Sequence, residues 1–135
     1  MGNLLVVDIL NSRTIKLKCD VYSIGGAEVV PVTLIYDTGA DKTSITRGVL
    51  EGLGYDRFLF SKTYKRTAIG MFKPYKCLVS RLVVGNQFGM DNLTVDVLEA
   101  LSSPSFDGVL GMDFISCVES VISGSRKQLE ISKRL

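Results

Sequence analysis

Residues 34–45 read LIYDTGADKTSI, and this stretch is the strongest indication of fold and function in the sequence. An apolar segment runs directly into Asp37, Thr38 places a hydroxyl beside the carboxyl group, and Gly39 permits a tight backbone turn. We expect Asp37 to lie half-buried at the mouth of a strand, where a carboxyl group can take part in acid–base chemistry. Taken alone, the tripeptide is also typical of an ordinary turn in which the aspartate accepts a hydrogen bond from its own backbone.

The composition directs attention to carboxylates. The chain of 135 residues contains no histidine, which excludes a Ser-His-Asp triad, a Cys-His pair and any zinc site with a histidine ligand. Its three cysteines, Cys19, Cys77 and Cys117, are far apart and form no CxxC unit. We therefore expect small buried thiols in a reducing compartment, with neither a metal site nor a disulfide framework.

Length and charge narrow the class of protein further. The length suits a single domain over residues 1–135, large enough to bury a core without staples. A net charge of +2, from 16 basic and 14 acidic residues, is unlike that of a dedicated nucleic-acid binder. The apolar run at residues 4–7 follows no basic residue, so no signal peptide is expected. No stretch approaches the ~18 apolar residues of a membrane span. We expect a soluble, cytoplasmic protein with no membrane association.

The hydropathy pattern along the chain mostly has a period of two, which is typical of strands with one buried face. Strands are expected at residues 15–21, 28–36, 93–97 and 109–110, in two arms at 58–69 and 72–84 around Gly70, and in a terminal hairpin, 118–123 and 128–132. Pro31 indicates an edge or bulge position. A short helix is expected over residues 46–54, with Thr46 as its cap and Gly54 as its stop, and a helical turn over 112–118. Many short strands with two small helices predict a β-barrel-like or sandwich fold.

The stretch around Asp37 resembles the active-site motif of the retropepsin-like aspartic proteases. Two further segments support the resemblance: residues 106–113, FDGVLGMD, are similar to the family's apolar-apolar-Gly segment, and residues 67–71, TAIGM, fall where the family has its flap. The order and spacing match over roughly residues 13–132. The resemblance is closer to cellular and bacterial members than to compact retroviral ones. It implies an all-β, retropepsin-like acid-protease half-barrel with one or two short helices.

The resemblance also implies roles for individual residues. Asp37 would be the catalytic aspartate, Thr38 would bond to its symmetry mate across a dimer axis, and the Gly39 carbonyl would hold substrate. The residues implied to contact substrate are Ala40 and Asp41 beside the motif, Ile69, Gly70 and Met71 in the flap, and Pro104, Phe106 and Val109 in side-chain pockets. Met112 stands where retroviral members usually have arginine, so Asp41 needs another partner, Arg126 or Lys127, or is partly solvated.

The implied activity is aspartic endopeptidase, acting on polypeptides without a cofactor. It needs two carboxyl groups that share one proton, and the chain has one Asp-Thr-Gly. A homodimer with two Asp37 residues on its axis is therefore expected. The apolar residues 4–10 and the hairpin ending at 129–131 are suitable contact material for it, because each is too apolar for a free strand edge.

Two alternatives remain open. The chain could be a catalytically idle retropepsin-like module for dimerisation or peptide binding. It could also bind single-stranded nucleic acid through basic and aromatic residues of the two arms. These are Lys62, Lys65, Arg66, Lys73, Lys76 and Arg81, interleaved with Phe60, Tyr64, Phe72 and Tyr75. The small net charge favours an ordinary solvated face over such a surface, so no nucleic-acid partner is expected.

Overall fold

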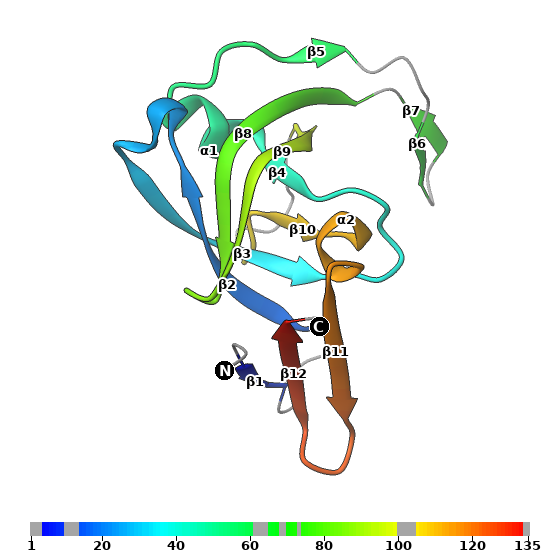
Figure 1. Ribbon diagram of the computed structural model, residues 1–135. Coiled ribbons are helices and arrows are strands. Elements are labelled where there is room, and N and C mark those ends of the chain that lie inside the picture. Colours follow the sequence, from blue (N-terminus) through cyan, green and yellow to red (C-terminus); the bar gives the residue numbers. More distant parts are fainter. Residues whose placement is uncertain are drawn as a thin grey trace.

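The computed structural model in Figure 1 describes residues 4–9, 14–60, 65–67, 70–72, 74–99 and 105–133. The elements in chain order are β1 (Leu4–Asp8), β2 (Lys16–Tyr22), the 3-10 turn η1 (Ile24–Gly26), β3 (Val29–Tyr36), β4 (Ser44–Thr46), α1 (Arg47–Gly52), β5 (Leu59–Phe60), β6 (Lys65–Thr67), β7 (Gly70–Phe72), β8 (Tyr75–Val84), β9 (Phe88–Leu98), β10 (Gly108–Leu110), α2 (Met112–Ile115), β11 (Val118–Ser123) and β12 (Gln128–Lys133). The expected all-β class with two short helices is confirmed.

Six strands close into a barrel. The order is β2-β3-β10-β4-β9-β8, and β8 returns to pair with β2. The β3–β10 and β4–β9 pairs are parallel, whereas the other four are antiparallel. β5 pairs with the start of β8, and β6 and β7 form a separate two-stranded hairpin beyond it (Figure 1). Closure leaves each of the six barrel strands with a partner on both sides, which removes the edges that an open sheet would expose.

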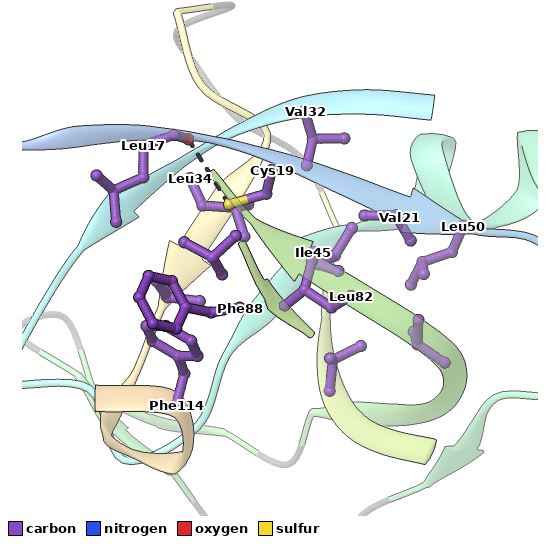
Figure 2. Packing of buried hydrophobic residues seen from close by; sticks show 14 of the residues in the cluster. Leu17, Cys19, Val21, Val32, Leu34, Ile45, Leu50, Leu82, Phe88 and Phe114 are labelled. Carbon is purple, nitrogen blue, oxygen red and sulfur yellow. Dashed lines mark hydrogen bonds between the residues drawn. The ribbon is translucent and has the colours of Figure 1, made fainter. Parts of the chain in front are cut away.

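The barrel interior is the hydrophobic core, and the period-two pattern of the strands fills it. In β2 the alternate residues Leu17, Cys19 and Val21 are almost fully buried. Figure 2 shows these side chains with others from β3, β4 and β8 around one interior. At one end the rings of Phe88 and Phe114 meet edge to face, with centroids 6.4 Å apart. Because Phe114 belongs to α2, this contact seats the second helix against the barrel.

A second sheet of three strands, β1-β12-β11, lies beside the barrel (Figure 1). The terminal hairpin predicted from the sequence is confirmed as β11 and β12, and β1 pairs with β12 of the same chain. Leu129 and Ile131 of β12 are fully buried. Within the described residues, β1 and β11 each have a neighbouring strand on one side only.

Most local predictions are confirmed, with small shifts. Thr46 occupies the cap position of α1, although its side chain makes no capping hydrogen bond. Gly54 adopts φ +87° just beyond the helix, a conformation that favours glycine. Among the described strands, only β2 lies beside β3 at Pro31, because β10 pairs with residues 34–36. Gly70 begins the return strand opposite Thr67, instead of forming the turn itself.

The cysteines correct one expectation. Cys19 and Cys77 are buried, and burial raises the pKa of Cys19 to about 12 and that of Cys77 to about 11. Cys117, expected to be buried, is exposed, because it follows α2 in a turn at the surface. All three thiols are free. In the part of the chain that the structure describes, no helix is long and apolar enough to cross a membrane.

Candidate active site

Asp37 stands at the end of β3, where two parallel strands deliver two loops to the same place. β3 and β10 run side by side, with Tyr36 opposite Leu110. The Asp37 N–H donates to the Leu110 carbonyl at 3.0 Å, so the first residue of the loop is still anchored to the neighbouring strand. Parallel strands end at the same edge of a sheet, which places residues 37–43 beside residues 111–113.

The Asp-Thr-Gly turn is closed by its own hydrogen bonds. The Gly39 N–H donates to Asp37 Oδ1 at 2.8 Å, and the Ala40 N–H donates to the Asp37 carbonyl at 3.2 Å. This is the bond that an ordinary aspartate turn also makes, so the turn alone does not define a catalytic site. Asp37, expected to be half-buried, is exposed in the single chain together with Thr38 and Gly39, because the loop projects beyond the strand that carries it.

The second loop, residues 111–113, holds the backbone of the Asp37 loop by hydrogen bonds. The Met112 N–H donates to the Ala40 carbonyl at 2.7 Å, and the Asp113 N–H donates to the Asp41 carbonyl at 3.2 Å. A Cβ at Gly111 would lie 2.6 Å from the Lys42 carbonyl carbon. Only glycine therefore allows the two backbones to approach this closely. The apolar-apolar-Gly segment therefore supports the backbone of the motif directly.

Asp113 is the supporting residue that sequence reasoning missed. Its Oδ2 accepts the Thr43 N–H at 2.9 Å, and its Oδ1 accepts the Thr43 hydroxyl at 2.7 Å. Thr43 is fully buried, and its Oγ1 in turn accepts the Gly111 N–H at 3.2 Å. One carboxylate thus joins the first turn of α2 to the loop that begins at Asp37. The available signal was the acidic residue two positions after the apolar-apolar-Gly segment, at a helix start that favours negative charge.

The structure describes some of the residues expected to contact substrate and leaves others outside the described residues. Ala40, Phe106 and Val109 are partly buried, and Val109 lies in β10 between Ile35 and Ser44. The backbone of Gly70 lies in β7. Three predicted contacts fall outside the described residues: Ile69, Pro104 and the side chain of Met71.

In the single chain, Asp41 forms an ion pair with neither Arg126 nor Lys127, the two partners considered for it. Its side chain is exposed and forms no ion pair with the described residues. Arg126 is instead 3.6 Å from Glu130 in its own hairpin. Lys127 adopts φ +52° in the turn of that hairpin, and its carbonyl accepts the Ile9 N–H.

The basic residues of the two arms are partly neutralised. Lys76 lies 3.4 Å from Asp96, a carboxylate that is almost fully buried, and Arg81 lies 2.6 Å from Asp91. The side chains of the other four cations in this group lie outside the described residues. Among the residues described, no three histidine, cysteine or acidic side chains gather as a metal site would need. The chemistry that the arrangement offers is acid–base chemistry by a carboxyl group on a braced, exposed loop.

Comparison with known proteins agrees with this fold. The fold is similar to the crystal structure of a retropepsin-like aspartic protease from Rickettsia conorii, with a TM-score of 0.68 and 18% sequence identity over 98% of this chain and 93% of that one. Curated protein sequences give no match. The sequence profile of the aspartyl protease family matches residues 21–114, which span the motif, both arms and the apolar-apolar-Gly segment. The chain belongs to this aspartyl protease family, and its fold is retropepsin-like.

Proposed function

We propose that the chain is an aspartic endopeptidase that works as a homodimer, with one Asp37 from each copy at a shared site. The observation that carries the proposal is the braced loop: Asp37 is exposed, while hydrogen bonds from β10 and α2 hold the residues around it. An exposed carboxyl group on a firmly held loop suits a site that is completed by a second copy. A two-fold axis beside Asp37 would bring the two equivalent carboxyl groups together.

The proposed chemistry follows from one proton shared by two carboxyl groups. The ionised Asp37 removes a proton from a water molecule, whose oxygen attacks the carbonyl carbon of the scissile peptide bond. The protonated Asp37 of the second copy donates its proton to the carbonyl oxygen, and a tetrahedral diol forms. Proton transfer to the amide nitrogen then lets the carbon–nitrogen bond break, releasing a carboxylic acid and an amine. Water is the only co-reactant, so no cofactor takes part.

Neighbouring residues take supporting roles in this proposal. Thr38 bonds to its symmetry mate, the Gly39 carbonyl and the Asp41 side chain hold the substrate backbone, and Ala40 lines the cleft. Phe106, Val109 and Pro104 shape apolar pockets, and Ile69, Gly70 and Met71 cover the substrate. The whole chain, residues 1–135, is proposed to act as one domain.

The three-stranded sheet supplies surface for a dimer. β1 and β11 have one strand neighbour each in the described residues, and exposed apolar side chains accompany both: Leu4 and Val6 in β1, and Val121 and Ile122 in β11. Open apolar edges favour pairing with another chain. The free thiols, one of them exposed, support a reducing compartment such as the cytoplasm.

The test uses Asp37→Asn, which keeps the shape of the side chain and removes its charge. Wild-type protein should cleave reduced, carboxymethylated casein at mildly acidic pH, and the variant should fold normally without cleaving. Specific activity should fall on dilution as dimers dissociate, and excess variant should inhibit the wild type under conditions of subunit exchange. A fully active monomer that is indifferent to the variant would refute the shared site. An inactive wild-type dimer that still binds peptides would favour the idle module.

A further inference from the structure

One arginine sits at the stem of the hairpin formed by β5 and β8. Arg47 begins α1, and its guanidinium carbon lies 4.7 Å from the ring centroid of Phe58 and 5.3 Å from that of Tyr75. Phe58 directly precedes β5, and Tyr75 begins β8. Because Phe60 pairs with Tyr75, the two rings belong to opposite arms of one stem. The same stem leads onward to β6 and β7 (Figure 1).

The edge of the Arg47 guanidinium donates two hydrogen bonds to the Glu99 carboxylate. Arg47 Nε lies 2.7 Å from Glu99 Oε2, and Nη2 lies 2.6 Å from Oε1. Glu99 follows β9 and stands immediately before residues 100–106, the segment that carries the proposed pocket residues Pro104 and Phe106. Arg47 therefore contacts both arms of the hairpin stem and Glu99, at the end of β9, at once.

The contact between Arg47 and Glu99 orients the elements that carry them more than it adds to the free energy of unfolding. The hydrogen bond between the two side chains lowers the pKa of Glu99 and raises that of Arg47. However, the Glu99 side chain is 58% exposed and that of Arg47 is 29% exposed, and ion pairs this accessible to solvent add little stability. A planar guanidinium can lie against rings while its edge makes two parallel hydrogen bonds, which lysine cannot do.

We propose that Arg47 is a positioning residue for substrate binding: it holds the hairpin stem, through Phe58 and Tyr75, against Glu99 at the end of β9. The inference rests on the proposed function, in which the hairpin is a wall of the substrate cleft. Because Arg47 acts on the hairpin and not on the Asp37 loop, its loss should weaken substrate binding and leave the chemical step nearly unchanged.

Hydrogen exchange tests the positioning without any assay of cleavage. In Arg47→Ala, peptides covering residues 58–76 should exchange about threefold or more faster than in the wild type, because the arms lose their shared contact. Arg81→Ala is the matched control, since it removes a 2.6 Å ion pair with Asp91 farther along β8. It should leave this segment unchanged. Equal exchange in Arg47→Ala and wild type, or an equal rise in the control, would overturn the proposal.

Kinetics on carboxymethylated casein test the link to substrate. Arg47→Ala should raise KM about tenfold with little change in kcat, as misplacement of a binding wall predicts. Glu99→Gln should shift KM in the same direction, and Arg47→Lys should not restore it, because a point charge cannot make the fork and ring contacts. An unchanged KM, or full rescue by lysine, would overturn the role in binding. An inactive wild type would refute the proposed function, while hydrogen exchange would still decide whether Arg47 holds the stem.

Discussion

Replacing Asp113 by alanine should loosen the loop that carries Asp37. The change removes the acceptors of two hydrogen bonds from Thr43, one from its backbone N–H and one from its hydroxyl. The Phe114 N–H, which also donates to this carboxylate, keeps the Gly111 carbonyl as a second acceptor at 3.1 Å. The expected loss therefore comes from Thr43, which is fully buried and has no water to replace its partner.

The magnitude follows from those two bonds. Hydrogen bonds to charged groups contribute about 1.5–3 kcal/mol each, and such losses are not fully additive. We expect the free energy of unfolding to fall by about 3 kcal/mol, which for a chain of this length lowers Tm by roughly 10 °C. Asp113→Asn should lower the free energy of unfolding by about half as much. The Asn amide can accept one hydrogen bond from Thr43 through its oxygen, but its NH2 group cannot accept the other.

Thermal and chemical denaturation of purified variants measure the effect, with casein cleavage as a second readout. Thr43→Val combined with Asp113→Ala completes a double-mutant cycle, whose coupling should be about 1 kcal/mol or more if the two side chains act together. Asp91→Ala, which removes an exposed carboxylate paired with Arg81, serves as the control and should leave Tm nearly unchanged. An Asp113→Ala variant within about 0.5 kcal/mol of wild type would refute the bracing role, since ordinary surface changes fall in that range.

Two further predictions concern a close backbone approach and the thiols. Gly111→Ala should severely destabilise the protein, because its Cβ would lie 2.6 Å from backbone of the Asp37 loop, whereas Gly124→Ala, with no atom within 4 Å, should fold with an unchanged Tm; equal melting curves for the two would contradict the approach. Iodoacetamide at neutral pH should modify Cys117 and spare Cys19, whose pKa burial raises to about 12, and intact mass should show one adduct in the native chain and three after unfolding. Two or three adducts on the native chain would contradict the burial.

Much of the fold was readable because its signals are local. The alternation in β2, the turn-forming Gly54 and the terminal hairpin each depend on residues close together in sequence, and all three are confirmed. The Asp-Thr-Gly motif and the apolar-apolar-Gly segment could likewise be recognised one at a time. The family and the fold class that they predict are confirmed.

The contacts that brace the site could not be read in the same way. Thr43 and Asp113 are 70 residues apart, and nothing near either residue names the other as its partner. Arg47 and Glu99, 52 residues apart, meet only because β4 and β9 pair in parallel and end at the same edge. The exposure of Asp37 and Cys117 likewise depends on what the rest of the chain covers.

By itself the sequence determined the class of chain: an all-β aspartyl protease homologue with one Asp-Thr-Gly and no histidine. Only the tertiary structure decided that a closed barrel places the two loops together, that Asp113 braces the Asp37 loop, and that Arg47 contacts the hairpin stem and Glu99 at once. The physical reason is the range of the interactions. Side-chain periodicity and turn geometry act over a few residues, whereas strand register across the barrel brings together groups that lie 50 to 70 residues apart.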